Sequence, residues 1–161
     1  MATPKQSTDT QLEIRRVFAA PREKVFRAWT ERRALEQWMC RDEATHDVQY
    51  TALDVRVGGR YSMNIRTPAG ELYVLEGTYR EVRPPEKLVF TWRWKKTPVR
   101  EGELSDTGET LLTVEFFERG GATEVVLRHE LPASAGPRES YEKGWNGCFE
   151  VLAKVLQASL H

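Results

Sequence analysis

The longest regular feature of the sequence is an alternation of apolar and polar residues over 47–131, followed by one helical repeat. The run RYSMNIR (60–66) sets Tyr61, Met63 and Ile65 on one face and charged or polar residues on the other. Such alternation is typical of an antiparallel sheet with one face in water. From Tyr141 to Leu156 the apolar residues recur with a helical period, which predicts an amphipathic helix of about five turns. Because a sheet with one apolar face must be covered, we expect this helix to pack on it.

Turns rich in glycine or proline divide the alternating region into strands. We expect six of them, at 47–55, 60–66, 71–82, 87–95, 111–118 and 123–131. In the first, Tyr50 and Ala52 are expected on one face. Gly77 lies inside a strand, where glycine indicates a bulge or the close approach of another backbone. The side chains expected to point inward from the last two strands are Leu112, Val114, Phe116, Val125, Leu127 and His129.

The region before residue 47 predicts one strand and two short helices. Residues 12–18 alternate and form the strand. Pro21 suits the first turn of a helix that runs to Trp29, and Thr30 can cap a second helix that ends near Trp38. The order is therefore β-α-α-β(six)-α, an α+β chain. We interpret residues 1–10 as a disordered leader and residues 11–161 as a single domain.

Charge and hydropathy exclude several classes of protein. The chain has 24 Lys plus Arg and 24 Asp plus Glu, a formal net charge of zero. A nucleic-acid binder needs an excess of cations, so we expect no nucleic-acid partner. The N-terminus lacks the apolar stretch of a signal peptide, and no run approaches the roughly 18 apolar residues of a membrane span. We expect a cytoplasmic protein, and a monomer.

Chemistry-bearing residues are sparse and scattered. Cys40 and Cys148 are far apart in sequence and form no CxxC motif, while His46, His129 and His161 are isolated. Metal sites usually need several ligands with short spacing, so we expect no metal, and two free thiols. GxSxG, HExxH and glycine-rich phosphate loops are all missing from the sequence. We therefore assign no catalytic residue and no cofactor.

The predicted architecture suggests a cavity. Six or seven strands make a twisted, curved sheet, and one helix about 10 Å wide cannot fill its whole concave side. Large inward side chains either leave a pocket or pack solid, and the sequence leaves both possibilities open. The ligand-binding residues expected to line such a pocket are Tyr61, Met63, Tyr73, Phe90, Trp92, Trp94, Phe116, His129, Trp145 and Phe149.

Some of these residues have a functional and a structural interpretation. His129 can orient a ligand or move a proton, or it can be a buried histidine satisfied by its neighbours. The hydroxyl groups of Tyr61 and Tyr73 can point into the cleft or reach solvent at its rim. Trp92 and Trp94 are two residues apart and share a face, opposite Trp145. They serve either as core or as a platform for a ligand.

Five segments, in this order and spacing, resemble the SRPBCC/START-like (birch-pollen-allergen-like) superfamily. They are IRRVFAAPREKVFRAWT, GGRYSMNI, EGTYREVRPPEKLVFTWRW, TEVVLRHELP and GWNGCFEVLAKVL. The nearest branch is named after the activator of the heat-shock-protein-90 ATPase. The resemblance implies a helix-grip fold, with a curved antiparallel sheet around a long C-terminal helix and an internal hydrophobic cavity. Relatives bind lipids, sterols, polyketides or hormones, and a few are cyclases or aromatases.

Three functions follow as hypotheses, because a fold does not fix an activity. The first is a binding protein for a small apolar or amphipathic ligand such as a lipid, sterol or polyketide. The second is a polyketide cyclase or aromatase, which requires His129 and Tyr61 or Tyr73 to converge on one open space. The third is a co-chaperone-like stimulator of a heat-shock-protein ATPase, which requires a contiguous exposed apolar patch.

Overall fold

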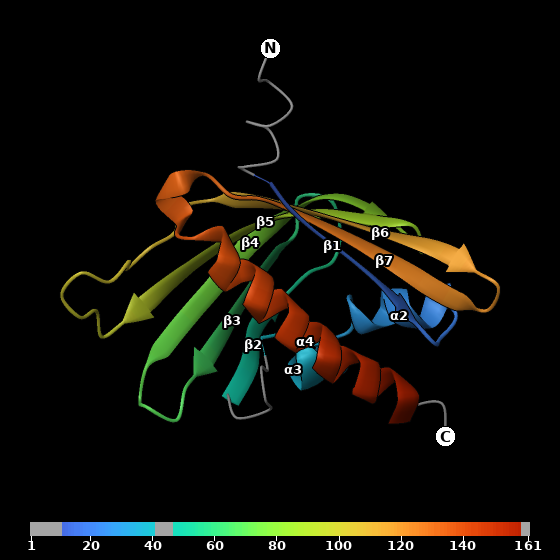
Figure 1. The fold of residues 1–161 in the computed structure, drawn as a ribbon, viewed down its shortest axis with the longest axis horizontal. Coiled ribbons are helices and arrows are strands. Elements are labelled where there is room, and N and C mark those ends of the chain that lie inside the picture. The colour runs from blue at the N-terminus through green and yellow to red at the C-terminus, as the bar shows by residue number, and fades with distance from the viewer. Residues whose placement is uncertain (1–10, 41–46, 159–161) are drawn as a thin grey trace, which may run out of the picture.

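A computed structural model describes residues 11–40 and 47–158 (Figure 1). The leader predicted at residues 1–10 lies outside the described residues. The described residues form seven strands, three α-helices and one short 3-10 helix, η2. Their bounds are β1 (Gln11–Phe18), α2 (Arg22–Ala28), α3 (Arg32–Trp38), β2 (Asp47–Leu53), β3 (Arg60–Arg66), β4 (Leu72–Arg83), β5 (Lys87–Thr97), β6 (Thr110–Arg119), β7 (Ala122–Glu130), η2 (Ala133–Ala135) and α4 (Arg138–Ala158).

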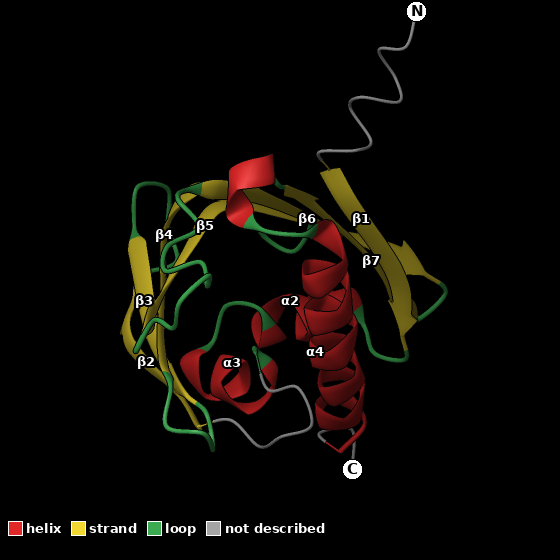
Figure 2. Cartoon of the chain, turned by 60° about the vertical axis from the view of Figure 1, so that its left-hand side comes forward, coloured by secondary structure: helices red, strands yellow, loops and turns green. Residues whose placement is uncertain are grey.

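All seven strands form one antiparallel sheet in the order β1-β7-β6-β5-β4-β3-β2. The strands from β2 to β7 pair with their sequence neighbours, and β1 joins the far edge beside β7, where Leu12 pairs with His129. Figure 2 shows the sheet bending around α4 and α3, so that both helices lie on its concave side. The predicted helix-grip order is therefore confirmed.

The concave face carries the core, as the alternation predicted. Leu112, Val114, Phe116, Val125 and Leu127 are all fully buried. Neighbouring residues of β6 and β7 point the other way, and several of them are only partly buried. Burial of apolar surface stabilises a protein by about 25 cal/mol for each Å², so this face is the main stabilising feature of the sheet.

The structure corrects the prediction that Thr30 caps the second helix. Glu31 is the N-cap residue of α3, and no side chain caps that helix. Thr30 instead donates its hydroxyl to the carbonyl oxygen of Phe26 at 3.1 Å. A threonine that follows a helix can bond back to the carbonyl four residues earlier, so it finishes α2 rather than starting α3.

The structure also corrects the face assigned to Ala52. Tyr50 is buried, but Ala52 is exposed, because the register of β2 against β3 shifts between these two residues. An extra residue in one strand turns the following side chains to the other face.

Gly77 lies where another backbone approaches closely, as a glycine inside a strand indicated. A Cβ atom built on Gly77 would lie 2.0 Å from the carbonyl oxygen of Thr91 and 2.6 Å from the ring of Tyr61. No side chain fits there. The hydroxyl of Tyr61 donates to the same Thr91 oxygen at 2.6 Å, so the ring crosses directly over the glycine. The sheet can bend tightly at this point.

Candidate ligand pocket

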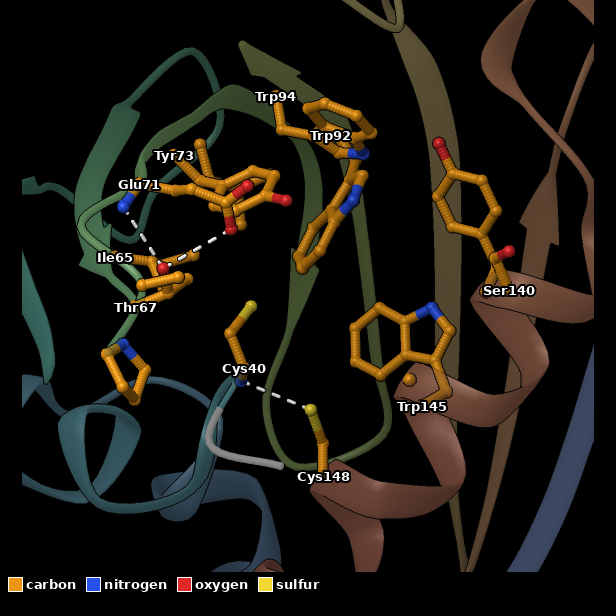
Figure 3. A pocket seen from close by; sticks show the side chains of 15 residues that line it. Cys40, Ile65, Thr67, Glu71, Tyr73, Trp92, Trp94, Ser140, Trp145 and Cys148 are labelled. Carbon is orange, nitrogen blue, oxygen red and sulfur yellow. Dashed lines mark hydrogen bonds between the residues drawn. The ribbon is translucent and has the colours of Figure 1, made fainter. Parts of the chain in front are cut away.

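A pocket of about 610 Å³ lies between the concave face of the sheet and α4. Its floor includes Ile65 of β3 and Leu75 of β4, and the hairpin between these strands supplies residues 67–69 and 71 at one side. Figure 3 shows the hairpin side chains facing those of β5 and α4 across the opening. The volume is within the roughly 300–1,000 Å³ that small-molecule sites commonly occupy.

Five aromatic residues form most of the wall. Trp92 and Trp94 come from β5, Tyr73 from β4, and Tyr141 and Trp145 from α4. The rings of Trp92 and Trp145 lie 5.0 Å apart between centroids, and those of Tyr73 and Trp94 lie 5.4 Å apart, edge to face. The neighbouring rings hold one another in place, so the wall is apolar and preorganised.

Small residues on α4 leave the pocket open beside the aromatic wall. Ser140, Gly144 and Cys148 line the pocket at intervals of four residues, so they lie above one another on the helix. A Cβ atom added to Gly144 would meet nothing within 4 Å. These three residues were not predicted to line the pocket, although small residues at i, i+4 and i+8 beside an aromatic stripe are a visible signal in the sequence.

Four of the ten predicted lining residues stand on this wall, namely Tyr73, Trp92, Trp94 and Trp145. The structure places the other six in the packed core beyond the pocket. Trp29, at the end of α2, lies 6.0 Å from the ring of Phe116 and 6.1 Å from that of Phe149. The two short helices thus fill one end of the concave face. The six residues outside the pocket wall are Tyr61, Met63, Phe90, Phe116, His129 and Phe149.

His129 is completely buried and uses both ring nitrogens. Its Nδ1 accepts a hydrogen bond from Nε1 of Trp145 at 3.3 Å. Its Nε2 then carries the proton and donates to Oγ1 of Thr110 at 2.8 Å, and that hydroxyl donates to the carbonyl oxygen of Trp92 at 2.7 Å. Burial lowers the pKa of His129 to about 3, so the ring is neutral. The structural interpretation of this histidine fits the geometry.

One rim of the pocket carries a charged cluster. Glu71 lines the pocket and accepts from Nζ of Lys96 at 3.0 Å, while the same ammonium reaches Glu103 at 2.8 Å. The bond with Lys96 holds the pKa of Glu71 below its usual value, so the carboxylate is ionised at neutral pH. Thr67 fixes the hairpin by accepting from the backbone N–H of Glu71 at 3.1 Å.

The two cysteines meet at the pocket, although 107 residues separate them in the sequence. The backbone N–H of Cys40 donates to Sγ of Cys148 at 3.1 Å (Figure 3). Both thiols are free. The hydrogen bond with Cys148 and burial raise the pKa of the Cys40 thiol, which stays protonated and therefore adds an uncharged surface to the pocket.

Within residues 11–40 and 47–158, no helix has the length and apolar character needed to cross a membrane. In the same residues, no three His, Cys, Asp or Glu side chains come close enough to hold a metal ion. The pocket is thus the feature of the described chain that best fits a small ligand.

A curved seven-stranded sheet around a long C-terminal helix, with an apolar pocket beside that helix, defines a helix-grip protein of the SRPBCC/START-like class. Within this class, the chain belongs to the family described as activator of Hsp90 ATPase homolog 1-like proteins, which matches residues 19–157. The family resemblance noted in the sequence is therefore confirmed. None of the curated proteins compared matches the sequence.

Solved structures from several bacteria share the fold. A protein from Chromobacterium violaceum is 25% identical, with a TM-score of 0.77 over 91% of this chain and 96% of that one. One from Mycobacterium smegmatis is 20% identical, with a TM-score of 0.75 over 96% and 93%. One from Rhizobium leguminosarum is 22% identical, with a TM-score of 0.75 over 92% and 94%.

Proposed function

We propose that this protein binds a small apolar or amphipathic molecule in the pocket between β3–β5 and α4. The observation that carries the proposal is the aromatic wall around a cavity of about 610 Å³. A ligand that displaces water from an apolar surface of this kind binds favourably, because apolar surface is removed from water. Membership in a family that commonly binds hydrophobic ligands supports the same function.

The other two hypotheses receive no supporting observation. His129 is not among the lining residues and has both ring nitrogens engaged, so it does not share an open space with Tyr73 as a cyclase would require. Only four large apolar side chains are exposed in the described residues, and they come from three segments that are distant in the sequence, which gives a chaperone contact no support. They are Val17, Val57, Val99 and Leu104.

The free thiols also bear on where the protein works. We retain the cytoplasm as the proposed location, since two cysteines separated by 107 residues are not the disulfide framework typical of small secreted domains. We retain the monomer as the proposed state.

A substitution at Gly144 tests the pocket directly. N-phenyl-1-naphthylamine, a neutral fluorescent probe, should bind the native protein saturably and gain fluorescence as it leaves water. Gly144→Phe should weaken this binding at least about tenfold, because the new ring occupies the open space beside Trp145.

Gly144→Ala is the matched control, since it changes the same helix position without filling the pocket, and its affinity should stay within about twofold of native. Far-UV circular dichroism checks that both variants are folded. Native-like probe binding by a folded Gly144→Phe protein would show that the pocket is not the binding site.

A further inference from the structure

The charge of the pocket wall restricts the ligand further, provided that the proposed binding function holds. Among the described lining residues, Glu71 is the only one with a charged side chain at neutral pH. Burial raises the pKa of Tyr73 and of Tyr141, so both phenols stay neutral. Among the described lining residues, a ligand therefore meets one carboxylate, which is paired with Lys96, and otherwise uncharged groups.

An anionic head group would lack a partner on this wall. Lys96 is a cation in contact with the rim of the pocket, but its ammonium group is already bonded to both Glu71 and Glu103. Its side chain is only 7% exposed. Arg100 also acts on the two carboxylates, but from an exposed position in the β5–β6 loop. A carboxylate or phosphate ligand would be desolvated beside Glu71 without gaining a hydrogen-bonded ion pair.

The aromatic rings favour the opposite charge. The faces of tyrosine and tryptophan rings are electron-rich and attract cations within about 6 Å. The ring of Tyr73 already attracts one cation, because Nζ of Lys96 lies 5.8 Å from its centroid. Figure 3 shows Glu71 and Tyr73 side by side and facing Trp92 across the pocket. An ammonium group in this place would contact a carboxylate and aromatic rings together.

We propose that the ligand is an amphipathic organic cation. Its ammonium group lies against Glu71 and Tyr73, and its apolar body, of aromatic size, lies between Trp92 and Trp145. The carboxylate and the rings provide the selectivity for positive charge, while the small side chains of α4, Ser140, Gly144 and Cys148, provide the room for the body.

Three probes with the same naphthalene body test this selectivity by isothermal titration calorimetry at neutral pH. They are 1-naphthylmethylammonium, 1-naphthylmethanol and 1-naphthoate, which are cationic, neutral and anionic. We expect the cation to bind roughly tenfold more tightly than the alcohol. The anion should bind more weakly than the alcohol. Raising the salt concentration should weaken only the binding of the cation.

Glu71→Gln separates charge from shape. It should lower the affinity for the cation several-fold, toward the level of the alcohol, because only the contribution of the rings remains, and it should leave the affinity for the alcohol unchanged. The matched control is Glu76→Gln. Glu76 lies on β4, pairs with Lys95 of β5 at 3.2 Å and is not among the lining residues. This control should bind all three probes as the native protein does.

The result can overturn the cation proposal without affecting the pocket. Equal affinity for cation and alcohol, preference for the anion, or an unchanged cation affinity in Glu71→Gln each refutes it. So does the failure of all three probes to bind. In each of these cases the pocket itself is judged separately, by the neutral-probe titration of Gly144→Phe.

Discussion

Gly77 controls how closely β4, β5 and the ring of Tyr61 approach. The space of its missing side chain is taken by the backbone oxygen of Thr91, which cannot move without breaking the hydrogen bond from Tyr61. The hydrogen atom that glycine carries in place of a side chain thus permits both the strand contact and the buried phenol. Overfilling such a place forces backbone shifts rather than a change of rotamer.

Gly77→Ala should therefore destabilise the protein by at least about 2 kcal/mol. Urea unfolding followed by far-UV circular dichroism measures the change. A variant as stable as the native protein would mean that the strands do not approach as described.

At the scale of the element, α4 has two requirements that conflict. Its apolar stripe must cover the sheet, with Trp145, Phe149 and Leu152 buried against it. Its small stripe must stay clear of the rings on β5. Gly144 meets the second requirement at a cost to the helix, because glycine in a helix interior is less favourable than alanine by roughly 0.5–1 kcal/mol.

Gly144→Ala should raise the free energy of unfolding by about 0.5–1 kcal/mol. The gain is expected because the added methyl group meets open space, in contrast to the same change at Gly77. Parallel urea titrations of the two alanine variants give shifts of opposite sign if the glycines have these roles. A loss of stability at Gly144 would contradict the open space.

At the scale of the whole molecule, His129 links the helix to the sheet. Through Trp145 it contacts α4, and through Thr110 it reaches β6 and the Trp92 carbonyl of β5. Its folded-state pKa of about 3 lies below its ordinary value of 6.5, so protons bind the unfolded chain first as pH falls. This difference makes global stability depend on pH.

The contribution of His129 is therefore fully favourable above about pH 6.5 and should fall by up to about 1.4 kcal/mol for each pH unit below it. His129→Gln keeps an acceptor and a donor but cannot be protonated, so its stability should depend less on pH between about pH 4 and pH 7. Urea unfolding of both proteins across this range measures the difference. Parallel stability curves for the native protein and His129→Gln would refute the buried neutral state.

The charged rim belongs to the same scale, because it joins three segments. Lys96 of β5 binds Glu71 before β4 and Glu103 of the β5–β6 loop. The hairpin, the strand and the loop are thereby held at one side of the pocket. No sequence pattern indicated this cluster, since the three residues are spread over 33 positions of a chain with many charges.

The order of strands and helices, the buried faces of β3, β6 and β7, and the inward position of His129 could be predicted from the sequence. These properties are local, because the spacing of apolar residues decides which way each side chain points from a strand or helix. Even the close approach at Gly77 was indicated by a single residue type.

Only the tertiary structure decided which inward residues line the pocket. Phe116 and Phe149 share the face of Trp92 and Trp145. Trp29 packs against both phenylalanines and also stacks on Trp145, yet Trp92 and Trp145 still border the pocket whereas the phenylalanines do not. The meeting of Cys40 with Cys148 arises in the same way. Periodicity fixes a side chain's direction within its own element, whereas the space in front of that side chain depends on elements packed there from distant parts of the chain.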